Sequence, residues 1–488
     1  MKPTPLSLNG ITICYVSTGA FGGVWRTWKQ ARTLADAGAR VVIVGYEHLM
    51  PTGLADSGHE VIEVPRPQPP EPPTMPDPPR AAPDLPPAPD FPEPPEWRNS
   101  TNPLRLFRVI ENRTVNRWAY EQAARPYKRA VSRYRQALQQ HEQDLLGHQE
   151  ELDRHAQAFS DYLEEEECYR KKTANPPPYF DWRANPVLVA AVVSTNADVV
   201  QAVDLPSLDC GWKASQELDA RLIYAAHEYW AGFLNNPDYA AEPAEAQGLL
   251  ALEHRLIGAA DLVTVTSDQM AERLVDRYGV TTPLTILNSP PERVESSRPV
   301  SQPVRLVYHG GLSNDRNIDG LIRAIALLGD LVTLDIHGFG RTVGEDVLQG
   351  LVDELGLGDS VHLHGAFQYA DVVDMLSTYD VGVMSAKVIE ENFEVTLPNK
   401  IFDCMCAGLA VAMYDSSAVR GVLNQVPFGI CIDPSSPESI ARDLDPLVRN
   451  PQRIAKMKAT AVGAAQRYWW PEQGRKLLEA IGDMLREN

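Results

Sequence analysis

The tract of prolines between Pro65 and Pro95 constrains this chain more than any other feature of its sequence. Of 40 prolines, 16 fall in this stretch, PRPQPPEPPTMPDPPRAAPDLPPAPDFPEPP. Because proline lacks an amide hydrogen and has a fixed φ, a segment so rich in it cannot join a helix or a sheet. The sequence therefore predicts an extended linker over residues 65–97, which interrupts the fold around it.

The residues after this linker, 98–183, are predicted to be a helical insertion. From about Tyr120 the apolar residues recur in heptads, which is the pattern of a coiled-coil seam. We expect a long helix from Tyr127 to Lys171, roughly 65 Å in length, which Pro126 kinks or begins. Its seam needs a partner, and three are open: a second copy of the chain in a homodimer, the 103–125 segment in a hairpin, or the body of the protein.

Outside these segments, short apolar runs alternate with helical stretches. The expected strands are GITICYV, ARVVIVGY, ADVVQAV, ARLIYAA and ADLVTVT, then VRLVYHG, VTLDIHG, SVHLHG, DVGVMS, LAVAMY and GICID. The run VLVAAVV at 187–193 also has the length of a buried strand. Such alternation predicts an α/β fold with two doubly wound parallel sheets, which bind ligands at the carboxyl ends of their strands.

This pattern places the domain boundaries. We predict a first domain from residues 1–64 and 184–295, a second domain from 296–468, and a terminal helix at 469–488.

The charge balance argues against a general affinity for two classes of partner and leaves a local basic pocket open. With 45 basic and 65 acidic residues the net charge is −20, whereas nucleic acids and anionic membranes require a basic face. No apolar run approaches the ~18 residues that span a bilayer, and the first residues lack the apolar core of a secretion signal. The six cysteines are scattered through apolar segments, as buried thiols are. A cytoplasmic protein is expected.

The stretch LPNKIFDCMCAG has a charge in an unexpected place. It opens an apolar helix with Pro398, Asn399 and Lys400, although a cation is misplaced at the positive end of a helix. A bound diphosphate would resolve the conflict. Asp403, which only accepts hydrogen bonds when ionised, would suit a ribose. The alternative is that Lys400 and Asp403 form an ordinary surface pair three residues apart.

Two glycine-rich turns follow predicted strands. STGAFGG contains Gly22 and Gly23, and YHGG contains Gly310 and Gly311, where backbone can approach a ligand closely. The first turn lacks the dinucleotide-binding spacing, so it could instead be a structural turn. Arg316 is close enough in sequence to add positive charge to the second turn, unless it is merely solvated.

These segments resemble a known family. YHGGLSNDRN, LDIHGFGR, VHLHGAF, YDVGVMS and LPNKIFDCMCAGLAVA are similar to the nucleotide-sugar-binding half of retaining GT-B glycosyltransferases of family 4. STGAFGG and ARLIYAAHEYW are similar to the glycine loop and the His-Glu strand end of its first domain, and RYWWPEQGRKLLEAIGDML to its returning terminal helix. The resemblance implies the GT-B fold, two Rossmann-like domains facing a cleft, here with a coiled-coil-like insertion in the N-terminal domain.

The resemblance also implies roles for residues. His227 would lie at the transferred sugar, and Arg316 and Lys400 would neutralise the leaving diphosphate, so these three are the expected catalytic residues. The expected donor-binding residues are Gly22, Gly23, Gly310, Gly311, Phe367, Glu394, Pro398, Asn399 and Asp403.

One departure concerns the family's two glutamates, which are eight residues apart. Asp403 stands in place of the second, and Val395 precedes it by eight, so Glu391 or Glu394 would have to replace the first.

The function implied is transfer of a sugar from a nucleoside-diphosphate sugar to an acceptor hydroxyl with retention of configuration. The acceptor would be a glycan or a small molecule. We expect neither a metal nor a cofactor beyond the sugar nucleotide. Two alternatives remain open: an epimerase or phosphorylase-like enzyme of the same fold, and a non-catalytic scaffold that uses the helical insertion.

Overall fold

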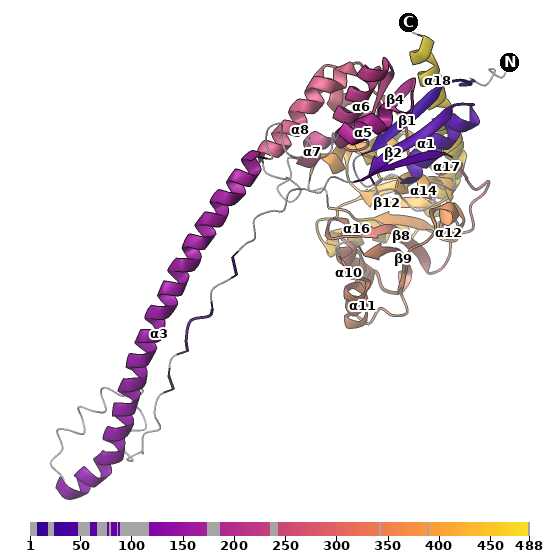
Figure 1. Cartoon of the computed structure of the whole chain (residues 1–488). Helices are drawn as coiled ribbons and strands as arrows, with labels where there is room; N and C mark the ends of the chain where they lie inside the picture. Colours follow the sequence, from indigo (N-terminus) through magenta and orange to yellow (C-terminus); the bar gives the residue numbers. More distant parts are fainter. Residues whose placement is uncertain are drawn as a thin grey trace. The chain divides into compact units, whose positions relative to one another are not determined.

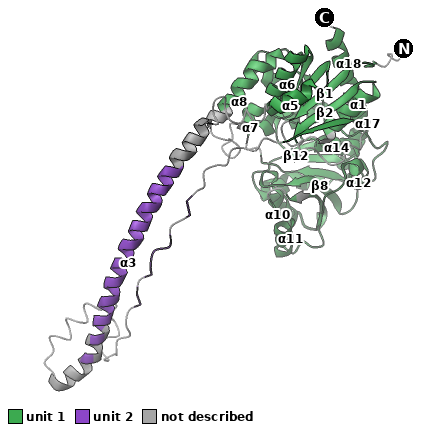
Figure 2. Ribbon diagram, in the orientation of Figure 1, with its two compact units in different colours: residues 1–68, 176–488 green, residues 69–175 purple. Residues whose placement is uncertain are grey.

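A computed structural model of the chain describes residues 7–17, 24–46, 59–65, 76–77, 80–84, 86–87, 117–172, 186–234, 243–340, 343–387 and 390–486. The chain divides into two compact units, residues 1–68 with 176–488, and residues 69–175 (Figure 2). The first unit contains two parallel β-sheets, and the second contains one long helix.

The first sheet has the strand order β3-β2-β1-β4-β5-β6-β7, with every neighbouring pair parallel. Its strands are β1 (Thr12–Ser17), β2 (Arg40–Tyr46), β3 (Glu60–Val64), β4 (Val199–Val203), β5 (Arg221–Ala225), β6 (Leu262–Val265) and β7 (Leu284–Thr285). The strand order reverses between β1 and β4, which is where ligands bind in sheets of this kind. The five predicted strands are present, whereas β3 and β7 were not predicted.

The second sheet has the order β10-β9-β8-β11-β12-β13 and is also parallel. Its strands are β8 (Val304–Leu312), β9 (Val332–Gly340), β10 (Val361–His364), β11 (Val381–Met384), β12 (Ala410–Tyr414) and β13 (Gly429–Ile432). All six correspond to the predicted apolar runs. The reversal here lies between β8 and β11, so the loop after β8 lies at the switch point.

Helices cover both sheets (Figure 1). Those of the first domain are α1 (Val24–Asp36), α5 (Pro186–Val193), α6 (Leu205–Leu218), α7 (Trp230–Leu234), α8 (Pro243–Leu256) and α9 (Asp268–Tyr278). Those of the second are α10 (Ile318–Leu328), α11 (Glu345–Glu354), α12 (Val372–Leu376), α13 (Glu391–Val395), α14 (Lys400–Cys406), α15 (Ser417–Gln425), α16 (Pro437–Val448) and α17 (Pro451–Tyr468), followed by α18 (Trp470–Arg486). Short 3₁₀ turns are η2 (Ile257–Ala259), η3 (Asn314–Arg316), η4 (Gly329–Leu331) and η5 (Tyr369–Asp371).

Alternate residues of each strand face opposite layers of the core. In β1, Cys14 and Val16 belong to one buried cluster, whereas Ile13 and Tyr15 belong to a second cluster that includes residues of α1 and α18. This two-residue period is the geometry of a strand buried on both faces. Because the strands bury apolar residues on both faces, their register is fixed. The strand ends, and the site residues that follow them, are therefore aligned.

The chain passes between the two domains twice, at adjacent points. The backbone amide of Trp470 donates to Pro290 O at 2.9 Å, and its indole donates to Thr33 Oγ1 of α1 at 2.9 Å. Helix α18 consequently lies against α1 of the first domain (Figure 1). Both connections, the linker near Pro290 and the start of α18, therefore lie together beside α1 at the domain junction.

The long helix of the second unit is α3 (Arg117–Lys172), which extends about 84 Å at 1.5 Å per residue. It begins before the predicted start at Tyr127, so the expectation that Pro126 could begin the helix is wrong. Proline removes one hydrogen bond, and helix formed cooperatively on both sides of it outweighs that loss. On the predicted seam, Leu138 and Leu145 are 36% and 41% exposed, whereas Tyr134, His141 and His148 are half-buried.

One strand prediction is wrong. The run 187–193 forms helix α5 and not a strand, with Pro186 at its first position and Leu188, Val189 and Val192 buried. Proline favours the first turn of a helix, and a short apolar run does not by its periodicity distinguish a strand from a buried helix. Among the helices that the structure describes, none is both long and apolar enough to cross a membrane.

A buried ion pair holds α17 to the second sheet. Lys458 Nζ lies 2.9 Å from Asp380 Oδ1 and 2.8 Å from Tyr379 O, and the Lys458 and Asp380 side chains are 1% and 2% exposed. Asp380 Oδ2 accepts from the amides of Ser301 and Arg305, both at 3.1 Å. Every charge in this network has a partner, so removing one partner leaves the other charge buried and uncompensated.

We expect Lys458→Met to lower the free energy of unfolding of the second domain by about 3–5 kcal/mol, because it strands the Asp380 carboxylate. Lys456→Met is the matched control, since Lys456 lies on the exposed side of the same helix. Urea denaturation of both variants measures the difference. Equal stability of the two variants would contradict the importance of the buried pair.

Candidate functional site

Lys400, the first residue of α14, lies across the end of β8. A Cβ atom placed on Gly310 would come within 2.6 Å of Lys400 Cε and 2.8 Å of Nζ, and Gly310 has a φ of +123°. Only glycine permits this contact, because any other side chain would both be strained and occupy the lysine's path. The Lys400 ammonium also lies 5.9 Å from the centre of the Tyr308 ring. The predicted Gly310 and Lys400 are thus brought together at the carboxyl end of a central strand.

Arg316 adds a second positive charge near this point. Its Nε lies 3.3 Å from Asp315 Oδ2, and its guanidinium lies 5.1 Å from the centre of the Phe393 ring. Burial, and then the charge of Arg316, lower the pKa of Lys400 to about 8. Within the described residues, no carboxylate lies within 4.0 Å of Lys400 Nζ. Arg316 is thus paired with Asp315, whereas the charge of Lys400 has no direct carboxylate partner in the described part of the chain.

His227 follows β5 and is fixed by a carboxylate that follows β4. Asp204 Oδ1 accepts from the backbone amides of His227 and Glu228 at 2.8 and 3.3 Å, and Asp204 Oδ2 lies 3.6 Å from His227 Nδ1. Burial holds the pKa of His227 well below its usual value, so the ring is neutral. The buried Nε2 atom has no hydrogen-bond partner among the described residues. With Nδ1–H directed at Asp204, Nε2 would accept a hydrogen bond from a ligand hydroxyl.

Arg26 places a further cation beside these groups. It is 6% exposed on α1, and burial lowers its pKa to about 10, although the charges of Asp204 and Glu228 oppose that effect. Burial raises the pKa of Asp204 to about 7. A buried arginine with nearby carboxylates is typical of a functional cleft, since an isolated charge would not be tolerated there.

Asn392 of α13 joins the second domain to the first beside these groups. Its Nδ2 donates to Glu228 Oε2 at 2.7 Å, and its Oδ1 accepts from the Tyr229 amide at 2.8 Å. A Cβ atom on Gly232 would lie 2.6 Å from the Asn392 amide nitrogen, so the two domains are in tight contact. His227 and Glu228 on one side and α13 on the other thereby share one compact region.

Asp403 is engaged within the protein. It is 2% exposed, Oδ1 accepts from the Tyr369 hydroxyl at 2.9 Å, and Oδ2 lies 3.1 Å from His309 Nε2. Both oxygens thus have partners already, and a ribose would have to share them. The ribose contact stays a prediction, and the geometry shows Asp403 as a link between α14, β8 and η5.

Phe367 lies beside a row of histidines. His309, His337 and His364 are paired in register on β8, β9 and β10, each directly before a glycine. Phe367 contacts His309 and His337 edge-on, with ring centres 6.1 and 6.4 Å apart. Burial lowers the pKa of His337 to about 4, so its ring is neutral. These histidine rings form a wall beside Phe367, whose role in donor binding stays a prediction.

The other predicted donor-binding residues have varied surroundings. Glu394 Oε1 accepts from the Ser417 amide at 2.8 Å at the start of α15, and Gly311 O accepts from the Tyr308 hydroxyl at 2.7 Å. Pro398 and Asn399 supply the first backbone acceptors of α14, to the amides of Ile401 and Phe402. Gly22 and Gly23 lie outside the described residues. The roles of these residues at a donor remain predictions.

Sequence reasoning missed Asp204, Arg26, Lys29, Tyr369 and His309. Two signals were available. Arg26 and Lys29 interrupt the buried face of α1, where apolar residues are expected, and the dipeptide His-Gly lies at or near the carboxyl ends of three neighbouring strands. Asp204 and Tyr369 had no signal of this kind, because their importance comes from partners distant in sequence.

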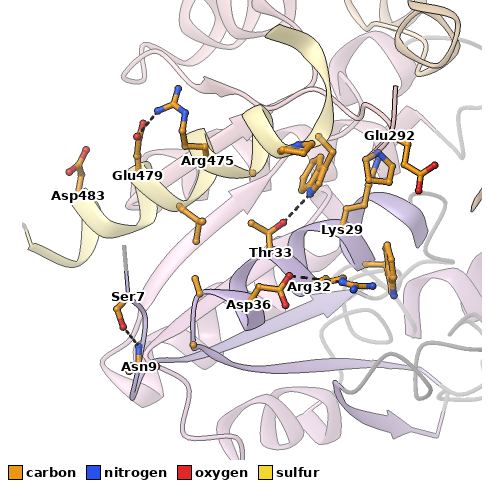
Figure 3. Close-up of a pocket in the computed structure, with 18 of the residues that line it drawn as sticks. Ser7, Asn9, Lys29, Arg32, Thr33, Asp36, Glu292, Arg475, Glu479 and Asp483 are labelled. Atoms are coloured by element: carbon orange, nitrogen blue, oxygen red, sulfur yellow. Dashed lines mark hydrogen bonds and ion pairs between the residues drawn. The ribbon is translucent and has the colours of Figure 1, made fainter. Parts of the chain in front are cut away.

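The structure also contains a hollow of about 1490 Å³ between α1 and α18 (Figure 3). Neither His227 nor Lys400 lines it. Charged side chains from the two helices face it, among them Arg32, Asp36, Arg475 and Glu479 (Figure 3). Lys29 and Tyr369 also line it, so the hollow reaches the domain junction but lies apart from the predicted catalytic residues. Within the described residues, no group of three or more histidine, cysteine or acidic side chains is arranged to hold a metal ion.

Two family profiles match the chain. Residues 291–463 match "Glycosyl transferases group 1", and residues 135–289 match "Glycosyltransferase Family 4", a match that begins within α3. D-inositol 3-phosphate glycosyltransferase from Xylanimonas cellulosilytica is 23% identical over 310 residues, which cover 59% of this chain and 72% of that protein. The enzyme of the same name from Kineococcus radiotolerans is 24% identical over 298 residues, covering 55% and 67%.

Solved structures agree in fold. Sucrose-phosphate synthase from Thermosynechococcus elongatus has a TM-score of 0.61 at 14% identity, covering 98% of this chain and 100% of that one. Anabaena HepE, solved in complex with UDP, has a TM-score of 0.60 at 14% identity, covering 97% and 100%. At such identities the likeness concerns the fold alone, and it confirms the predicted pair of Rossmann-like domains. Together with the two matching profiles, it shows that the chain is a glycosyltransferase of the GT-B fold that belongs with family 4.

Proposed function

We propose that the chain is a retaining hexosyltransferase that moves a sugar from a nucleoside-diphosphate sugar to an acceptor hydroxyl. The observation that carries the proposal is Lys400, laid over Gly310 beside Arg316, with no carboxylate of the described residues within ion-pair distance. Positive charge left unpaired in a protein with a net charge of −20 suits an anion that arrives with the substrate. A diphosphate is such an anion, and HepE, which shares the fold, was solved with UDP.

The proposed reaction breaks the bond between the anomeric carbon and the diphosphate oxygen, which keeps the electron pair. Lys400 and Arg316 stabilise the negative charge that grows on the leaving diphosphate, where their effect on the rate is largest. The anomeric carbon then bonds to the acceptor oxygen, whose proton is released. His227, neutral and with Nε2 available, would accept a hydrogen bond from a hydroxyl of the transferred sugar. Side chains alone supply the positive charge in this scheme.

The proposed acceptor is a glycan or a small molecule. The relatives named above act on an inositol phosphate by their names, but 23% identity does not carry an acceptor over to this chain.

Replacing Lys400 tests the proposal. We expect Lys400→Ala to lower the turnover number at saturating donor by about two orders of magnitude, because a charge that stabilises the transition state is lost. Lys456→Ala, an exposed change on α17, is the control. Turnover is measured over a panel of nucleoside-diphosphate sugars, with products analysed with and without acceptor. A folded Lys400→Ala variant with unchanged turnover would contradict the assignment, and a changed sugar or sugar phosphate formed without acceptor would indicate an epimerase or a phosphorylase.

The pKa of Lys400 predicts a pH dependence. Because burial and Arg316 lower that pKa to about 8, the free enzyme loses this cation as the pH rises through 8. Affinity for a nucleoside diphosphate should therefore fall in that range. In Lys400→Arg the guanidinium stays charged, so the fall near pH 8 should disappear. Calorimetric titrations from about pH 6 to 9 with UDP, GDP and ADP measure both variants. The same fall near pH 8 in both would show that another group titrates.

We also propose that α3 joins two copies of the chain through its heptad seam. Leu138 and Leu145, one heptad apart on that seam, are exposed apolar side chains within the described residues, which a second helix would cover. The double variant Leu138→Glu/Leu145→Glu should convert a dimer into a monomer in light scattering. Leu146→Glu is the matched control, because Leu146 is 63% exposed and lies off the seam. A monomeric unmodified chain, or a double variant that remains dimeric, would contradict the proposal.

A further inference from the structure

Lys29 is a buried cation at the junction between the domains. It projects from α1 with 2% of its surface exposed, and its Nζ donates a hydrogen bond to Ser289 O of the interdomain linker. The ammonium lies 5.6 Å from the centre of the Tyr369 ring and 5.1 Å from the Trp470 ring. Lys29 therefore contacts the linker, the second domain and the start of α18 at once.

Tyr369 carries this contact toward the donor site. While its ring faces Lys29, its hydroxyl donates to Asp403 Oδ1 at 2.9 Å. Asp403 in turn holds His309 Nε2 at 3.1 Å. His309 directly precedes Gly310, the residue over which Lys400 lies. A chain of contacts thus runs from α1 of the first domain to both elements that position Lys400, namely α14 and the end of β8.

We propose that Lys29 is a positioning residue for sugar transfer: through Tyr369 and Asp403 it sets the geometry of the Lys400–Gly310 site according to the position of the first domain. The inference rests on the proposed function. It assigns Lys29 no contact with substrate. When the two domains are in the contact seen here, the ammonium on the Tyr369 ring favours the orientation in which the hydroxyl donates to Asp403.

A lysine is a costly choice for packing alone. Transferring an ammonium out of water is unfavourable, and an apolar residue of the same length would fill the space between the two rings without that cost. Burial lowers the pKa of Lys29 to about 7. The Asp403 carboxylate stabilises the protonated form of Lys29, whereas the charge of Arg26 destabilises it. A buried cation that is stabilised by an anion of the other domain couples the two domains electrostatically.

Two substitutions and their combination test the coupling. Lys29→Met keeps the length and removes the charge, and Tyr369→Phe keeps the ring and removes the hydroxyl. We expect each to weaken binding of the nucleoside diphosphate by about tenfold and to raise the donor KM, with the acceptor KM unchanged. The double variant should bind no more weakly than either single variant, because both break the same chain of contacts. UDP, GDP and ADP are the probes in calorimetry.

Arg32→Met is the matched control, since Arg32 lies on the same helix, is exposed and pairs with Asp36 at 4.0 Å. It should leave nucleotide affinity unchanged. The melting temperature separates positioning from packing. Lys29→Met should not lower it, because Asp403 keeps its partners Tyr369 and His309, and removal of a buried charge offsets the lost hydrogen bond to Ser289 O. A lower melting temperature with unchanged nucleotide affinity, or effects of the two substitutions that multiply in the double variant, would overturn the inference. A parent chain that binds none of the three nucleotides would instead refute the proposed function, and the inference with it.

Discussion

The buried carboxylate of Asp403 is the interaction on which the predicted donor site depends. With 2% of its surface exposed, it would be untenable without partners, and it has two, Tyr369 and His309. These partners come from η5 and β8, so one side chain of α14 fixes the helix against two other elements. The position of Lys400 at the start of α14 is a consequence of that anchoring and of the space above Gly310.

Positive charge gathers at the domain junction of a strongly acidic protein. Arg26 and Lys29 come from α1, and Arg316 and Lys400 come from the loop after β8 and from α14. Burial lowers the pKa of Arg26, Lys29 and Lys400, so the fold holds these cations at a cost that packing alone would not explain. An anionic ligand bound between the domains would offset that cost, as the sugar nucleotide of the proposed function would.

The sequence was sufficient to predict elements whose signal is local. Eleven apolar runs became strands, and Lys400 and Gly310, predicted from separate motifs, proved to be in contact. The failures have physical causes. Residues 187–193 form a helix because an apolar run does not encode its own period, and β3 and β7 are short strands at the two edges of their sheet. Asp204 and Tyr369 were missed because their partners lie far away in sequence, where only the tertiary structure brings them together.

The aspartate at position 403 links the predicted donor site to the buried lysine of α1. Where the resemblance to the family places a glutamate, this chain has an aspartate, one methylene shorter, whose carboxylate is held at His309 and Tyr369. Both oxygens of this carboxylate bind protein side chains, and a ribose would have to share them. Tyr369 then has a charged acceptor for its hydroxyl and a cation, Lys29, on its ring, so each contact strengthens the other. The departure from the family pattern at Asp403 and the unexpected lysine on α1 are accordingly two ends of one arrangement.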